Sequence, residues 1–210
     1  MRKWWRLPSH NSNFKRTTWG DLIAAPAEVS AAPDATPDGI SWAKGIGGGF
    51  PLGAFWARDR DAAPGGSLAD LLGPGTHGTT YGGSPLASAV GLAVLSAMEK
   101  ENLLANAAER GAQLRTAVVD MRSPLVVDVR GAGLLLGIEI EGFRWRGQSE
   151  PDTRPPALRL TLKLLENGLL VVPAGESVLR LLPPLNVSAA ECDEAAGILR
   201  ETLALAEPLP

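Results

Sequence analysis

The chain has 210 residues, of which 45% are hydrophobic, so it can bury a sizeable core in one or two domains and is not a disordered protein. Its net charge of −3 and pI of about 5.5 provide no global basic field for nucleic acid, and no apolar run approaches the roughly 20 residues that cross a bilayer. The single cysteine, Cys192, and the two histidines offer neither a disulfide framework nor a zinc ligand set, so we expect no metal and a reducing, cytoplasmic location.

The first segment, residues 1–34, differs in composition from the rest of the chain. Residues 1–20 carry basic and tryptophan side chains, contain no acidic residue and show no clear period. A membrane-surface arm or a transit sequence is the less favoured interpretation, because the segment has no apolar h-region and no clean amphipathic helix. Residues 24–39 are rich in alanine and proline, which predicts a linker.

A lysine followed by a cluster of glycines comes next, in the string Ala-Lys-Gly-Ile-Gly-Gly-Gly-Phe-Pro at 43–51. Apolar runs predict a mostly buried strand over 40–43 and a second strand over 52–57. Lys44 would then lie at a strand end beside glycines that block no approach, a place that suits Schiff-base chemistry with a carbonyl. A phosphate-binding P-loop is excluded, since it places the lysine after its glycines, whereas a solvated lysine beside a turn remains an alternative.

A second glycine-rich loop, Gly-Thr-His-Gly-Thr-Thr-Tyr-Gly-Gly-Ser-Pro, occupies 75–85 and follows a short helix predicted over 67–72. Ser84 as N-cap and Pro85 as first residue predict a helix, whose apolar positions recur at helical spacing at Leu86, Val90, Ala93, Val94 and Ala97. Hydroxyls and free amides before a helix suit an anion such as phosphate, although such loops are usually only turns. We interpret His77 as structural rather than catalytic.

The remainder alternates helices with short strands, which predicts an α/β fold. A helix is expected over 103–121, with its buried side at Leu103, Ala107, Leu114 and Val118. A second helix is expected over 156–166 and ends at the C-cap pair Asn167-Gly168. A third begins at the capping box Ser188–Glu191. Strands are expected over 126–130, 134–141, 169–172 and 178–182, and a polar loop over 143–153. The sequence Gly131-Ala-Gly133 is not a dinucleotide-binding loop, because a strand rather than a helix follows it. Cys192 is most simply a core thiol.

Arg180 is a charge inside the apolar strand Val-Leu-Arg-Leu-Leu-Pro-Pro-Leu. A charge in such a place must be paired or solvated. A carboxylate on a substrate would match the fork of its guanidinium, and a structural salt bridge is the equally open alternative.

Three of these motifs together resemble the class III pyridoxal-phosphate-dependent aminotransferases, the acetylornithine and ornithine aminotransferase family. They are the lysine–glycine string at 43–51, the hydroxyl loop at 77–85 and Arg-Gly-Ala-Gly-Leu-Leu-Leu-Gly-Ile-Glu at 130–139. The resemblance implies that Lys44 bonds covalently to pyridoxal 5'-phosphate and that Thr80 reaches the cofactor phosphate of a neighbouring subunit. It also implies that Thr79 lies by the substrate and that Arg180, before Pro-Pro-Leu, binds the substrate α-carboxylate.

The resemblance further implies a partial fold type I transferase, an α/β architecture. Residues 35–98 would be a remnant of the cofactor-binding large domain, and residues 99–210 the small α/β domain. The implied activity is acetylornithine transamination in arginine biosynthesis with 2-oxoglutarate as acceptor, by a homodimer that binds only small molecules and neither nucleic acid nor membrane. Ornithine and 4-aminobutyrate aminotransferases share these motifs and remain alternatives.

The resemblance begins near Ala35 and covers only the second half of the family's sequence. In the family, the carboxylate on the pyridine nitrogen, the aromatic stacked on the ring and the main phosphate loop lie upstream of the lysine, and residues 1–33 match none of them. We therefore expect a truncated aminotransferase. A non-catalytic remnant, unable to hold the cofactor, is the competing hypothesis.

Overall fold

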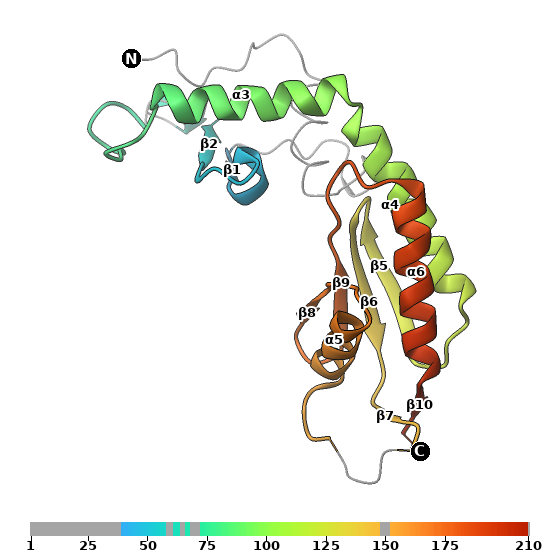
Figure 1. Ribbon diagram of the computed structural model, residues 1–210. Helices are drawn as coiled ribbons and strands as arrows, with labels where there is room; N and C mark the ends of the chain where they lie inside the picture. The colour runs from blue at the N-terminus through green and yellow to red at the C-terminus, as the bar shows by residue number, and fades with distance from the viewer. Residues whose placement is uncertain (1–38, 58–60, 64–65, 68–71, 148–151, 210) are drawn as a thin grey trace. The chain divides into compact units, whose positions relative to one another are not determined.

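The computed structural model describes residues 39–57, 61–63, 66–67, 72–147 and 152–209 (Figure 1). This part of the chain divides into two compact units, with residues 39–101 in unit 1 and residues 102–209 in unit 2. The predictions for residues 1–34, and most of the short helix expected over 67–72, lie outside the described residues. Among the described helices, none combines the length and apolar character that crossing a bilayer requires.

Unit 1 consists of two small antiparallel ladders and one long helix. Strand β1 (Gly39–Trp42) pairs with β2 (Ala54–Ala57), and β3 (Asp61–Ala63) pairs with β4 (Gly66–Ser67). The prediction of strands around the lysine–glycine string is confirmed, but the expectation that 40–43 is mostly buried is wrong. Ile40 and Trp42 are half-buried and Ser41 is exposed, because within the described residues β1 has a single strand neighbour, β2.

The long helix of unit 1, α3 (Pro85–Lys100), begins as the sequence predicts. The Ser84 side chain accepts a hydrogen bond from the backbone N–H of Ala87 at 3.2 Å, and Pro85 is the first helical residue. The predicted apolar face is only partly correct, because Leu86 is 63% exposed whereas Met98 is buried. Ile46 and Met98 are the buried hydrophobic residues of unit 1 among those described, so this unit has little core of its own.

Unit 2 is a four-stranded antiparallel sheet packed against three helices. The strands lie in the order β5 (Val126–Ala132), β6 (Leu135–Ile140), β9 (Val178–Leu181) and β8 (Val172–Ala174). The helices are α4 (Leu103–Asp120), α5 (Pro156–Glu166) and α6 (Ala189–Ala204), and a small ladder joins β7 (Phe143–Trp145) to β10 (Ala206–Pro208) (Figure 1).

Strand alternation decides which face of the sheet forms the core. Leu136, Ile138 and Leu179 are buried in a single cluster with apolar residues of all three helices. Because successive strand residues point to opposite faces, Gly137, Glu139 and Arg180 lie on the other face. Cys192 is 1% exposed within the cluster, as predicted, and burial raises the pKa of its thiol.

Local signals placed the ends of the unit 2 helices correctly. Helix α5 spans the predicted residues, with Asn167 as C-cap and Gly168 at a φ of +94°. The capping box is present, since the Ser188 side chain accepts from the Glu191 N–H at 3.2 Å and the Glu191 carboxylate accepts from the Ser188 N–H at 2.8 Å.

Two predictions in unit 2 are wrong. Residues 143–145 form strand β7 rather than a polar loop. The Phe143 side chain is 1% exposed, and the Arg159 Cζ lies over its ring, 4.4 Å from the ring centroid. The strand expected over 169–172 begins only at Val172, because the N–H of Leu169 still donates to the Leu164 carbonyl at 2.8 Å in the turn that ends α5.

Candidate functional site

Lys44 lies at the junction between β1 and the 3-10 helix η2 (Lys44–Gly47). Its φ of +57° is left-handed, which costs a non-glycine residue about 1 kcal/mol or more. Gly48, also left-handed, closes the turn by donating its N–H to the Gly45 carbonyl at 3.0 Å. The backbone therefore holds Lys44 at a sharp reversal of the chain, a strained conformation of the kind that clusters at functional sites.

The glycines of the loop have two different roles. A Cβ on Gly47 would lie 3.1 Å from the Leu52 Cβ, and one on Gly48 would lie 3.1 Å from the Val94 Cγ2 of α3. These glycines allow the loop to pack on its own unit. A Cβ on Gly45 or Gly49 would meet nothing within 4 Å, so only these two leave open space, which corrects the expectation that all the glycines do.

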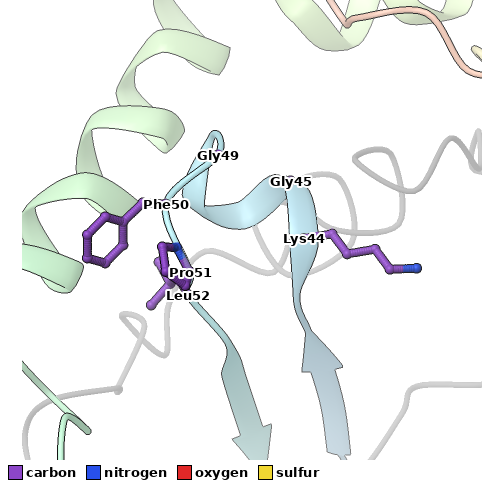
Figure 2. A pocket seen from close by; sticks show the side chains of 6 residues that line it. All are labelled: Lys44, Gly45, Gly49, Phe50, Pro51 and Leu52. Carbon is purple, nitrogen blue, oxygen red and sulfur yellow. The ribbon is translucent and has the colours of Figure 1, made fainter.

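A cavity of about 440 Å³ adjoins Lys44 and is lined by Lys44, Gly45, Gly49, Phe50, Pro51 and Leu52. Figure 2 shows the Lys44 side chain extended from the end of β1 away from Phe50 and Pro51. The side chain is exposed and makes no hydrogen bond or ion pair within the described residues. An amine that is free of partners beside a cavity of ligand size can form a covalent bond with a carbonyl ligand.

The structure does not bring the hydroxyl loop to Lys44 within this chain. Thr79 and Thr80 are exposed just before α3 begins, and neither hydroxyl bonds to another described residue. The lysine loop instead packs against Gly91 and Val94, roughly 10 to 15 Å further along α3 at 1.5 Å per residue. The two threonines therefore lie toward the N-terminal end of α3, apart from the residues of α3 that the lysine loop contacts.

His77 lies in a turn rather than beside the lysine. The Thr76 hydroxyl donates to the Gly73 carbonyl at 2.8 Å, and the His77 Nδ1 lies 3.2 Å from the same hydroxyl oxygen. This contact fits a role in holding the loop.

Arg180 lies in β9 of unit 2, directly opposite Gly137 of β6 and Val172 of β8. It is half-buried, and its Nε is buried without a hydrogen-bond partner. No carboxylate of the described residues forms a salt bridge with it, so these residues do not supply the structural partner that the sequence left open. An unpaired, partly buried guanidinium costs stability and offers its donors to an incoming anion.

A second arginine lies on the same face of the sheet. The Arg130 Nη1 donates to the Asp128 Oδ2 at 2.9 Å and also to the Glu139 carboxylate. These hydrogen bonds, first the one that Glu139 accepts and then the one that Asp128 accepts, raise the pKa of Arg130. Sequence reasoning missed that Arg130 lies across Gly137 from Arg180, and strand alternation combined with the pairing register is the signal that places it there.

Comparison with known proteins gives the following similarities. Residues 20–203 match the family model of class III aminotransferases. The acetylornithine aminotransferase of Thermosynechococcus vestitus is 41% identical over 171 residues, which cover 80% of this chain and 37% of that protein. Acetylornithine aminotransferase 1 of Bordetella bronchiseptica is 44% identical over 168 residues, which cover 79% of this chain and 38% of that protein.

Solved structures give a consistent result. The acetylornithine aminotransferase from Elizabethkingia anophelis matches with a TM-score of 0.67 at 32% identity, covering 81% of this chain and 40% of that chain. The ornithine aminotransferase from Toxoplasma gondii, whose crystals show partial occupancy of pyridoxal phosphate at the active site, matches with a TM-score of 0.72 at 29% identity and covers 90% of this chain and 42% of that chain. The chain thus spans well under half the length of the relatives it matches.

Proposed function

The chain belongs to the class III aminotransferases, and we propose that it takes part in pyridoxal-phosphate-dependent transfer of an amino group, with acetylornithine as donor and 2-oxoglutarate as acceptor. The observation that carries the proposal is the position of Lys44, whose unpaired amine lies at the end of β1, beside an open cavity lined in part by Gly45 and Gly49. The relatives named acetylornithine aminotransferase support the choice of donor.

The residues around the cavity fit an aldehyde cofactor at its reactive end. The Lys44 amine is accessible, and the glycines leave space where side chains would otherwise stand. Phe50 is a lining residue from which the Lys44 side chain extends away, and the lining residues include no carboxylate to pair with a ring nitrogen. The fit therefore rests on the amine and the space beside it.

In this proposal Lys44 has two tasks. Its Nζ would hold the cofactor covalently. When free, the same amine would accept a proton from the substrate carbon and give one back, as general base and acid. Pyridoxal phosphate, when bound, supplies the electron sink that makes this proton removable.

Other residues bind rather than react. Arg180 orients the substrate carboxylate through the fork of its guanidinium, and its unpaired Nε supports this role. Thr80 binds the cofactor phosphate of a second subunit, and Thr79 lies by that subunit's substrate. Their exposed position, away from the Lys44 loop of the same chain, fits a contribution to a partner.

The proposed assembly is a homodimer acting on a small-molecule amino donor and a 2-oxo acid. Within it, residues 35–98 belong to the cofactor-binding domain and residues 99–210 to the small domain, after an N-terminal segment at 1–34, whose last residues, from 20 on, also match the family model. Ornithine is the alternative donor, because ornithine aminotransferases are among the structural neighbours. A chain that cannot turn over on its own is the second candidate, favoured by the lack of a carboxylate among the cavity-lining residues.

The test is a transamination assay on the purified chain supplied with pyridoxal phosphate. We expect glutamate to form from 2-oxoglutarate with acetylornithine as donor, faster than with ornithine or 4-aminobutyrate, and Lys44→Ala to abolish it. Lys100→Ala, which removes an exposed lysine at the end of α3, is the control and should keep full activity. Absence of glutamate at saturating cofactor and substrates would reject turnover by this chain and leave the second candidate.

A further inference from the structure

Helix α5 has a second face besides the one that packs in the core of unit 2. Leu160 and Leu164 belong to the core cluster. The residues at the spacing i, i+3, i+4 and i+7, which share a different face of the helix, are Arg159, Leu162, Lys163 and Glu166. These four line a cavity of about 690 Å³ within unit 2. Its volume lies within the range of about 300 to 1,000 Å³ that is usual for small-molecule sites.

Positive charge exceeds negative charge around this cavity, which we call the α5 cavity. Its charged lining residues are Arg146, Arg154, Arg159, Lys163 and Glu166. The Glu166 carboxylate pairs with Lys163 at 2.9 Å, and Asp152 pairs with Arg154 at 2.6 Å. These two ion pairs leave Arg146 and Arg159 as a surplus of two positive charges. An anionic ligand would compensate for this surplus.

Arg159 is held in a fixed position, yet its donors are not all used. The side chain is only 6% exposed, its Nη1 donates to the Phe143 carbonyl at 2.8 Å, and its Cζ lies over the Phe143 ring. The Asp152 Oδ2 lies 3.5 Å from the Nε but forms no hydrogen bond with it, so the Nε is buried without a hydrogen-bond partner. An unsatisfied donor on a buried guanidinium costs stability, which an anion in the cavity would offset.

Arg146 is the second unused cation of the α5 cavity. It directly follows β7, and its backbone N–H donates to the Leu205 carbonyl at 2.9 Å, which fixes its backbone beside the cavity. Its side chain is exposed and forms no ion pair within the part of the chain that the structure describes. The lining also contains the apolar groups of Trp145, Leu162 and Leu205, so the cavity can contact an uncharged body as well as an anion.

We propose that the α5 cavity binds a phosphate monoester carried on an aromatic or apolar body, the chemistry of a nucleoside monophosphate, with Arg146 and Arg159 binding the phosphate. A phosphate monoester has a charge of about −1.5 to −2 at pH 7, which matches the surplus of two positive charges. Its oxygens accept the paired donors of a guanidinium, whereas a single carboxylate would leave one charge uncompensated. The site uses neither Lys44 nor Arg180, so it is additional to the proposed transamination.

The test is isothermal titration calorimetry of the purified chain with adenosine 5'-monophosphate. We expect saturable binding, and a dissociation constant about tenfold higher in Arg146→Gln, the scale of one lost charge-assisted hydrogen bond. Because Arg146 is exposed, its substitution leaves the packing of unit 2 intact. Arg200→Gln removes an exposed arginine of α6 that does not line the cavity and should bind within twofold of the unaltered chain.

Three further comparisons separate the parts of the proposal. Arg159→Lys keeps the charge but removes the Nε donor and should also raise the dissociation constant. Adenosine, which lacks the phosphate, and inorganic phosphate, which lacks the body, should each bind at least about tenfold more weakly than adenosine 5'-monophosphate. Lys44→Ala should bind it with unchanged affinity, so that failure of this site and failure of the proposed function are distinguishable.

Several results would overturn the proposal. No binding at millimolar adenosine 5'-monophosphate would reject the site, and equal weakening by Arg146→Gln and Arg200→Gln would show only non-specific attraction of charge. Adenosine or inorganic phosphate binding as tightly as the monophosphate would reject the proposed ligand chemistry. Unchanged affinity in Arg159→Lys would remove Arg159 from the site, and loss of binding in Lys44→Ala would place the ligand beside Lys44 instead.

Discussion

Lys44 and Arg180 are cations without ionic partners among the described residues, and Lys44 lies beside an open cavity. Lys44 adds a left-handed backbone conformation, and Arg180 adds a buried Nε without a hydrogen bond. Both features cost folding free energy. Natural sequences commonly keep such local costs where a ligand compensates for them, which is why we assign function to these residues rather than to the well-paired Arg130 and Arg154.

Asp152, which precedes α5, is the opposite case, a carboxylate with many partners. Its Oδ1 accepts from the Arg154 N–H at 3.0 Å and from the Arg154 Nε at 2.9 Å, and its Oδ2 lies 3.5 Å from the Arg159 Nε. The bonds from Arg154 lower the pKa of Asp152 to about 2.

Asp152 should therefore stabilise the protein in a defined range of pH. Because the folded pKa lies below the unfolded value of about 3.9, the stabilisation is complete above roughly pH 4 to 5 and is lost as the pH falls through 2. We predict that Asp152→Asn has a lower melting temperature than the unaltered chain at pH 6 and that the difference shrinks toward pH 2. Glu201→Gln, at an exposed carboxylate without an ion pair in the described structure, is the control, and a difference for Asp152→Asn that stayed constant with pH would contradict the prediction.

At the scale of elements, the sequence predicted what local chemistry determines. The N-cap of α3 at Ser84 and the C-cap of α5 at Asn167 depend on residues within one turn, and the structure confirms both. Strand β7 was missed because its partner, β10, is about 60 residues away in the chain and gives it a buried face that the local sequence does not reveal.

In the candidate site, too, the features set by the local sequence were predictable, and those set by packing between distant segments were not. The strand, turn and strand around Lys44 were predictable from the apolar runs and the glycines. The packing of Gly48 against Val94 was not, because it depends on how α3 lies on the loop. The row of Arg130, Gly137 and Arg180 across the sheet was likewise hidden, since it depends on the register of β5, β6 and β9, which no local motif encodes.

Gly111 offers a direct test of how α4 packs on the sheet. A Cβ there would lie 2.0 Å from the Gly133 carbonyl oxygen, a backbone atom that cannot move aside. We predict that Gly111→Ala lowers the free energy of unfolding by about 3 kcal/mol despite the better helix propensity of alanine. The measurement is urea unfolding followed by circular dichroism.

The matched control for Gly111→Ala is Gly197→Ala in α6. A Cβ at Gly197 meets nothing within 4 Å, so alanine there should raise the free energy of unfolding by about 0.5 to 1 kcal/mol. Similar effects of the two substitutions would mean that α4 and the loop at Gly133 do not pack as closely as described.

At the scale of the whole molecule, the hydrophobic core is unevenly distributed. The main cluster of buried residues lies in unit 2, whereas the described residues of unit 1 bury only Ile46 and Met98 among hydrophobic side chains. Because burial of apolar surface is the dominant stabilising contribution, unit 2 should remain folded under conditions in which unit 1 opens.

Hydrogen exchange followed by mass spectrometry tests this difference. We predict that amides of β6 and of the buried face of α5 exchange at least about tenfold more slowly than those of β1 and β2, because the latter open without breaking a core. Pyridoxal phosphate should slow exchange in the Lys44 loop with little effect on β6. Equal protection of β1 and β6 without cofactor would contradict the uneven core.

The central claim, that the Lys44 amine is the group that bonds covalently to the cofactor, is tested most directly by trapping that bond. The purified chain is incubated with pyridoxal phosphate, reduced with borohydride, digested and mapped by mass spectrometry. The account predicts saturable labelling of Lys44 well above that of Lys100 and Lys163, and no such site in Lys44→Ala. Labelling spread equally over the lysines, or an unlabelled Lys44 at saturating cofactor, would contradict it.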